Sequence, residues 1–228
     1  MNYRALIAEF VGTFALIFVG VGSIAVSQMT HEVGVVGVAL AHGLTIMVMV
    51  SALGMVSGGH FNPAVTAGVL AGRRISIALA VGYWVAQLLG GIAGALVDRL
   101  VFPSGVLNAI SLGTPAPAGG ITWYGAVVME AVLTFFLMLV IFGTAIDRRA
   151  PRLGGLFIGL TITLDILAAG PLTGAAMNPA RAFGPALVSG HLGSVWIYFV
   201  GPMLGALLAA AYYRLGLEEP TEAAQTTR

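Results

Sequence analysis

Cysteine and lysine are absent from this sequence of 228 residues, and charged residues of all kinds make up only 8% of it. Without cysteine, the chain can form no disulfide, no thiolate metal site and no thiol nucleophile. The formal net charge of +1 is too small to favour a nucleic-acid partner. No nucleophile, base and oxyanion site occur together, so we expect no enzyme activity, no cofactor and no metal site.

Apolar residues form 58% of the chain, and its mean hydropathy of +0.98 lies far outside the range of soluble domains. Each of six apolar stretches is about long enough to cross a hydrocarbon layer of roughly 30 Å as a helix: residues 5–27, 33–56, 77–97, 121–146, 153–170 and 194–213. The first stretch is too long for a signal peptide, so we expect it to remain as a span. The sequence therefore predicts an all-α, multi-pass protein of the lipid bilayer, with one domain over residues 1–228.

The ten basic residues are all arginines, and their positions predict the orientation of the chain. Eight lie near the N-terminus, after the second apolar stretch, between the fourth and fifth, and in the C-terminal tail: Arg4, Arg73, Arg74, Arg148, Arg149, Arg152, Arg214 and Arg228. Because basic residues favour cytoplasmic loops, both termini are expected in the cytoplasm. Arg99 and Arg181 do not fit this distribution. Composition alone, rich in Ala, Gly and Arg, favours a bacterial inner (cell) membrane.

The chain repeats itself. The segment Asn62-Pro63-Ala64 recurs 116 residues later as Asn178-Pro179-Ala180, and Glu9 matches Glu130 within similar surroundings. The sequence therefore predicts a duplication, with repeat 1 over about residues 3–101, an external linker over 102–120, repeat 2 over about 121–216 and a polar tail over 217–228. Each repeat has three spans, so the copies are inverted, and such repeats place the functional site near the midplane.

A helix of about ten residues is predicted to begin at each Asn-Pro-Ala segment, because asparagine is a favoured N-cap and proline a favoured first residue. Such a helix is about 15 Å long, half the hydrocarbon thickness. Two of them entering from opposite faces would meet, N-terminus to N-terminus, at the centre of the membrane. The residues before them would present backbone carbonyl acceptors to a cavity: Gly58, Gly59, His60, Phe61, Gly174, Ala176 and Met177.

The two caps suit a neutral solute. If each asparagine oxygen caps its own helix, its NH2 group points into the cavity as a donor. The two helix N-termini each carry roughly half a positive charge, which opposes cations and protons. We therefore expect a passive pore for small uncharged molecules.

With these paired motifs, the sequence resembles the aquaporin and glycerol-facilitator family, or major intrinsic proteins, over about residues 3–214. The resemblance implies a bundle of six helices and two half-helices, a pore in each subunit and a homotetramer. It also implies a selectivity filter of His42, Ile166, Ala175 and Arg181, a combination similar to that of plant vacuolar-membrane aquaporins. Glycerol facilitators usually carry an aspartate where this chain has Ala182.

Water is the expected main solute, with ammonia, hydrogen peroxide and urea as additional candidates and glycerol the least favoured. A glycerol-facilitator-type channel, a coupled secondary transporter and a junction protein with a closed pore remain alternatives. Glu9 and Glu130 are expected to be structural, accepting hydrogen bonds from the loops before the half-helices. Asp165 has no acidic counterpart in repeat 1, and two interpretations stay open for it: a satisfied interior carboxyl or a residue that tunes the filter.

Overall fold

The computed structural model describes residues 2–150 and 153–218 of the chain. This part is helical and contains no strand. Its α-helices are α1 (Tyr3–Thr30), α2 (Gly34–Ser57), α3 (Pro63–Ala71), α4 (Ile77–Val101), α5 (Ser104–Ala109), α6 (Trp123–Ile141), α7 (Gly154–Thr173), α8 (Pro179–Ser189) and α9 (Ile197–Tyr212). A 3-10 turn, η1 (Ser111–Gly113), follows α5, and π-helical turns extend α6 and α9: η2 (Phe142–Ile146) and η3 (Tyr213–Leu217).

Six helices, α1, α2, α4, α6, α7 and α9, are long and apolar enough to cross a membrane, which confirms the predicted spans. The first apolar stretch is among them. The bounds of each helix lie within a few residues of the apolar stretch that predicted it. The expected all-α membrane fold is therefore confirmed.

Small residues let the long helices approach closely. A Cβ atom on Gly90 of α4 would lie 2.4 Å from the carbonyl oxygen of Phe10 on α1, and one on Gly205 of α9 would lie 2.1 Å from that of Ala131 on α6. Helices α2 and α7 cross where Gly43 faces Gly159, at the repeat offset. Close backbone contact of this kind drives helix association in lipid, where no hydrophobic effect acts between helices. The matched glycines give both repeats the same packing.

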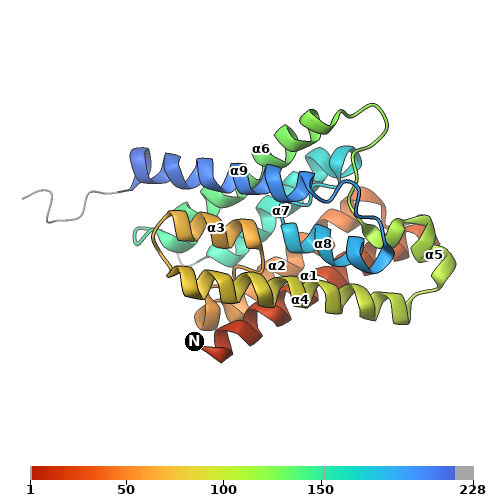
Figure 1. Cartoon of the computed structure of the whole chain (residues 1–228), viewed down its shortest axis with the longest axis horizontal. Coiled ribbons are helices and arrows are strands. Elements are labelled where there is room, and N and C mark those ends of the chain that lie inside the picture. Colours follow the sequence, from red (N-terminus) through yellow and green to blue (C-terminus); the bar gives the residue numbers. More distant parts are fainter. Residues whose placement is uncertain (1, 151–152, 219–228) are drawn as a thin grey trace, which may run out of the picture.

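The two short helices α3 and α8 lie roughly end to end in the middle of the bundle (Figure 1). Each packs against a long helix of the other repeat, α3 against α9 and α8 against α4. The start of α1 and the end of η3 lie at the same end of the bundle (Figure 1), as an even number of spans requires. We call this the arginine-rich end, because Arg74, Arg149 and Arg214 gather there.

The linker between the repeats contains more structure than its Pro, Gly and Ser content predicts. Residues 102–120 include α5 and η1, and Leu107 and Leu112 are buried against the core. Part of the linker is therefore held by packing. The predicted polar tail lies outside the described residues except for Leu217 and Glu218, and so do Arg152 and Arg228.

Candidate functional site

The two half-helices begin with the predicted asparagine caps. The Asn62 Oδ1 atom accepts hydrogen bonds from the backbone N–H groups of Ala64 at 2.8 Å and Val65 at 3.4 Å. Asn178 Oδ1 accepts from Ala180 at 3.0 Å and Arg181 at 3.2 Å. Pro63 and Pro179 occupy the first helical position, where a missing N–H costs nothing. Both helix N-termini are thus capped and face each other.

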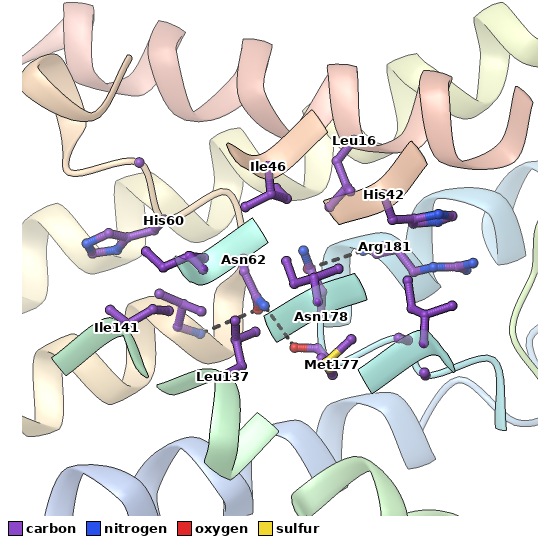
Figure 2. Close-up of a pocket in the computed structure, with 17 residues that line it drawn as sticks. Leu16, His42, Ile46, His60, Asn62, Leu137, Ile141, Met177, Asn178 and Arg181 are labelled. Carbon is purple, nitrogen blue, oxygen red and sulfur yellow. Dashed lines mark hydrogen bonds between the residues drawn. The ribbon is translucent and has the colours of Figure 1, made fainter. Parts of the chain in front are cut away.

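The amide groups of the two asparagines are not entirely free, which revises the expectation that their NH2 groups simply point into a cavity. Asn62 Nδ2 donates to the carbonyl of Met177 at 2.8 Å, and Asn178 Nδ2 donates to that of Phe61 at 2.9 Å. Figure 2 shows the first of these bonds. Backbone carbonyls at this depth need donors, and each cap supplies one to the opposite loop. One N–H of each amide remains for a solute.

Glu9 of α1 is fully buried and holds the loop before α3. Its carboxylate accepts hydrogen bonds from the backbone N–H groups of His60 at 2.9 Å and Phe61 at 2.6 Å, and from the Ser57 hydroxyl at 2.6 Å. Phe61 has a positive φ of 48°, which is costly for a residue with a side chain. The carboxylate therefore compensates backbone strain beside the cap.

Glu130 of α6 occupies the equivalent place in the second repeat. It accepts hydrogen bonds from the N–H groups of Ala176 at 3.0 Å and Met177 at 2.7 Å, and from the Thr173 hydroxyl at 2.8 Å. Ala175 and Met177 have positive φ angles of 41° and 52°. These bonds are the ones that the expected structural role of both glutamates requires.

Three cavities follow one another through the bundle. The central one, of about 30 Å³, lies where the half-helices meet and is lined by Asn62, Asn178 and apolar residues of the long helices. An outer cavity of about 560 Å³ adjoins it on the side of Arg181, and one of about 1150 Å³ opens at the arginine-rich end. Two wide mouths thus flank a narrow waist.

The four residues expected to form a selectivity filter all line the central cavity, and His42, Ile166 and Arg181 also line the outer one. His42 and Arg181 lie side by side (Figure 2). The Nδ1 atom of His42 lies 2.8 Å from the carbonyl oxygen of Val38. Because a carbonyl only accepts, Nδ1 carries a proton and donates it, and Nε2 takes no part in this bond. Arg181 is only 5% exposed, and its guanidinium donates to the carbonyl of Gly113 at 2.9 Å.

The predicted line of carbonyl-bearing residues divides among the cavities. Gly59, His60, Ala176 and Met177 line the central cavity. Gly58 and Gly174 line the two mouths instead. Phe61 is fully buried and lines none of these cavities, because its ring packs against Gly12. Its carbonyl, like that of Met177, already accepts a hydrogen bond from an asparagine. The central row of acceptors is therefore shorter than the sequence suggested.

Several residues of the site were not predicted. Gln87 donates to Glu9 at 2.7 Å and to Thr66 at 2.9 Å, and Thr66 contacts Nδ1 of His60 at 3.0 Å. The sequence offered no spacing that links them, because they meet only when α4 packs against α1 and α3. The contact of the Gly113 carbonyl with Arg181 was also not predicted, because a backbone carbonyl is present in every residue and the residue type does not reveal it.

Two buried carboxyls lie outside these contacts. Asp165, next to Ile166, has one carboxylate oxygen buried with no hydrogen-bond partner in the part of the chain that the structure describes. Asp98 of α4 is fully buried with neither oxygen paired among the same residues. Over residues 2–150 and 153–218, no group of three or more His, Cys, Asp or Glu side chains could hold a metal ion.

Comparison with known proteins gives a consistent result. The family model described as Major intrinsic protein matches residues 1–213. The chain is 42% identical over 221 residues to a protein of Arabidopsis thaliana named Probable aquaporin TIP2-2, covering 93% of this chain and 86% of that one. It is 44% identical over 226 residues to Probable aquaporin TIP3-2 of the same plant, covering 93% and 83%.

A solved structure agrees with these sequences. The fold matches the X-ray structure of the aquaglyceroporin from Plasmodium falciparum with a TM-score of 0.82 and 26% identity, covering 93% of this chain and 96% of that one. The fold, the paired capped half-helices and the sequence matches all lead to one assignment. The chain belongs to the major intrinsic protein family, whose members are channels rather than enzymes.

Proposed function

We propose that the chain is a passive channel for water across a lipid bilayer. The observation that carries this proposal is the waist of about 30 Å³ between two much wider mouths. A water molecule occupies about 10–15 Å³ by the same measure, so the waist holds only a few water-sized molecules at a time. The name aquaporin borne by the sequence relatives supports the same solute.

The donors at the waist suit water and oppose ions. Asn62 and Asn178 each retain one N–H for a solute, while their carboxamide oxygens are held by helix caps. Two positive helix ends and the guanidinium of Arg181 raise the energy of any cation there. A proton would have to pass the same barrier. The asparagines have no titratable group for ion coupling, which favours a channel over a coupled transporter.

We infer that His42, Ile166, Ala175 and Arg181 form the selectivity filter. The side chains of Ile166 and Ala175 offer no hydrogen bond, and Ala175 contributes little bulk, so the aperture admits some molecules larger than water. Ammonia, hydrogen peroxide and urea are the expected additional solutes. The structural neighbour is an aquaglyceroporin, so glycerol passage is the second candidate function, although Ala182 stands where that subgroup usually has an aspartate.

We further propose a homotetramer with both termini in the cytoplasm. The tetramer follows from the resemblance to the family, and the orientation from the arginines. Exposed apolar side chains on α2 and α7, such as Leu44, Val48 and Leu164, are available to lipid or to a second copy. The relatives are plant proteins, so they do not support the bacterial cell membrane that composition favoured.

Stopped-flow light scattering on proteoliposomes tests the proposal directly. Vesicles with the purified protein should shrink faster than empty vesicles in an impermeant osmolyte, and should pass protons no faster than empty vesicles do. Reswelling in urea and in glycerol then ranks the other solutes. Water permeability equal to that of empty vesicles would contradict the channel, and uphill solute accumulation driven by an ion gradient would identify a transporter.

A further inference from the structure

A short segment, Ser111–Thr114, separates the outer cavity from a second pocket, and we call it the strap. Gly113 and Thr114 line the outer cavity beside Arg181. Ser111 and Leu112 line the second pocket, which has a volume of about 250 Å³ and is also bordered by Ser189. The strap therefore lies between two cavities, with Leu112 and Gly113 buried and Ser111 and Thr114 partly exposed.

The backbone of the strap is strained. Ser111, Leu112 and Gly113 have consecutive positive φ angles of 49°, 53° and 67°. Left-handed conformations are costly for residues with a Cβ and persist only when the surroundings hold them. The result of this conformation is that the carbonyl of Gly113 receives the guanidinium of Arg181 at 2.9 Å.

Two contacts besides the hydrogen bond from Arg181 anchor the strap to the rest of the fold. The side chain of Leu112 is buried in the core and only 3% exposed. The hydroxyl of Thr114 lies 3.1 Å from that of Ser189, the last residue of α8. Leu112 anchors the strap to the bundle, and the hydroxyl pair fastens it to the helix that carries Arg181.

These contacts close a ring. Arg181 stands in the first turn of α8 and Ser189 at its end, about 12 Å apart along the axis. Neighbouring strap residues bind both ends, Gly113 through the long arginine side chain and Thr114 through the serine hydroxyl. The position of the guanidinium along the pore is thus tied to the end of its own helix through the strap.

We propose that Thr114 and Ser189 are positioning residues for the selectivity filter. Their hydrogen bond holds the strap, and the strap holds Arg181 over the aperture. Without it, the left-handed turn can relax into the second pocket, the carbonyl of Gly113 withdraws and the guanidinium is free to swing aside. This inference rests on the proposed channel function, and it predicts a change in selectivity rather than loss of the pore.

A double-mutant cycle tests this pair. Thr114→Val, Ser189→Ala and the double variant are reconstituted, and the ratio of urea to water permeability is measured by stopped-flow light scattering. Loss of one uncharged hydrogen bond raises the population of the displaced strap about fivefold, so the ratio should rise by up to about fivefold in each single variant. Ser189→Ala also removes a long bond of 3.4 Å to the carbonyl of Ala186, within α8 itself. Because the Thr114–Ser189 bond is lost in all three variants, the double variant should match the singles rather than multiply their effects.

Two controls separate this role from general damage. Thr114→Ser keeps the hydroxyl and should restore the wild-type ratio. Asn108→Ala changes a residue that lines the same pocket and has no side-chain hydrogen bond among the described residues, and it should leave the ratio unchanged. If the wild type conducts water normally but the ratios in the variants are unaltered, the positioning role is wrong and the channel function stands. The same holds if the effects multiply in the double variant. Absent wild-type permeability overturns the proposed function as well.

Discussion

The two half-helices of the channel share their supports and differ in the side chains beside the pore. In both repeats an asparagine caps the half-helix, a buried glutamate accepts hydrogen bonds from the N–H groups of the preceding loop, and a tyrosine donates to the carbonyl of the last residue of the long helix before that loop. Tyr83 donates to Ser57 and Tyr198 to Thr173, both at 2.6 Å. The parts that shape the backbone are therefore duplicated.

The residues of the proposed selectivity filter are not duplicated, although the two asparagines are. At the repeat offset, Val65 of α3 corresponds to Arg181 of α8. Likewise His60, paired with Thr66, corresponds to Ala176. Both half-helices need the same backbone geometry, so the residues that support it occur twice. One constriction with one cationic side chain, Arg181, is enough to discriminate among solutes, so it occurs once. This comparison leads us to expect that the symmetric positions shape the pore and that the asymmetric positions set its selectivity.

The largest effect is expected from replacing Glu130, the buried glutamate of repeat 2. In Glu130→Gln, an amide NH2 replaces an oxygen that accepts backbone N–H groups at the centre of the membrane, leaving donors face to face. We expect a loss of about 2–3 kcal/mol of stability, because charge-assisted bonds are lost and a buried donor is left unpaired. The thermal unfolding midpoint and the yield of monodisperse protein in detergent measure it.

Glu9→Gln is the matched control in the first copy. There Gln87 has a buried, unpaired Oε1 atom that can turn to accept the new NH2 group. We therefore expect a loss smaller by about 1 kcal/mol than that of Glu130→Gln. Equal losses in both copies would argue against this difference, and normal yield with altered proton coupling in Glu130→Gln would contradict a structural role.

The shared frame is also what the sequence made predictable. The spans follow from apolar length, and the half-helices follow from Asn and Pro at caps, because these signals are local. The hydrogen bonds that Gln87 and Thr66 make depend on how distant helices pack, and no local pattern encodes them. The contact between Gly113 and Arg181 was harder still to predict. Every residue has a backbone carbonyl, and only the strained backbone at Gly113 directs this one toward Arg181.

The next effect concerns the asymmetric position itself. Arg181→Val copies Val65 into the second half and removes the only charge at the waist end of α8. We expect the ratio of urea or glycerol to water permeability to rise about tenfold, the factor for one hydrogen bond to a charged group, and proton leak to appear. Proteoliposome shrinkage, reswelling and a pH-sensitive dye inside the vesicles measure the three fluxes.

Arg181→Lys separates the effect of the positive charge at this position from the effect of the guanidinium's hydrogen bond to Gly113. It keeps the positive charge but loses the planar fork that binds Gly113. Proton exclusion should therefore persist while discrimination among neutral solutes weakens. If Arg181→Val left every ratio unchanged, selectivity would lie elsewhere and the contrast between the copies would carry no functional meaning.

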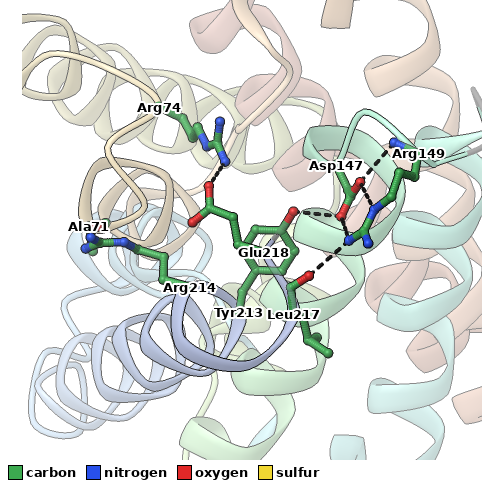
Figure 3. Close-up of polar contacts among 8 residues, drawn as sticks. All are labelled: Ala71, Arg74, Asp147, Arg149, Tyr213, Arg214, Leu217 and Glu218. Carbon is green, nitrogen blue, oxygen red and sulfur yellow. Dashed lines mark hydrogen bonds and ion pairs between the residues drawn. The ribbon is translucent and has the colours of Figure 1, made fainter. Parts of the chain in front are cut away.

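A second asymmetry separates the repeats at the arginine-rich end. Helices α6 and α9 of repeat 2 both end in π-helical turns, where Phe142 and Tyr213 stack with ring centroids 4.7 Å apart. Figure 3 shows the polar contacts around Tyr213. Asp147 accepts hydrogen bonds from Arg149 and, at 2.8 Å, from the Tyr213 hydroxyl, while Arg149 also donates to the carbonyl of Leu217. An ion pair joins Arg74 of repeat 1 to Glu218.

The smallest effect is expected from Tyr213→Phe, which keeps the ring stack and removes one hydrogen bond at this end. We expect a loss of about 0.5–1.5 kcal/mol of stability and no change in solute selectivity, because the proposed filter lies toward the opposite mouth. Thermal unfolding in detergent and the urea-to-water permeability ratio measure the two quantities. A changed ratio would mean that the arginine-rich end also sets the aperture.

The pH dependence of that loss sharpens the test. Hydrogen bonds from Arg149 hold the pKa of Asp147 well below its usual range. A carboxyl with a lowered pKa contributes stability above its usual pKa and loses it only as the pH falls toward the lowered value. Asp147 therefore stays ionised from pH 7 down to about pH 3, below the usual aspartate pKa of about 3.9, and the difference between Tyr213→Phe and the wild type should be the same at both pH values. A difference that shrinks by about pH 3 would show that Arg149 does not hold the pKa of this carboxyl below its usual range.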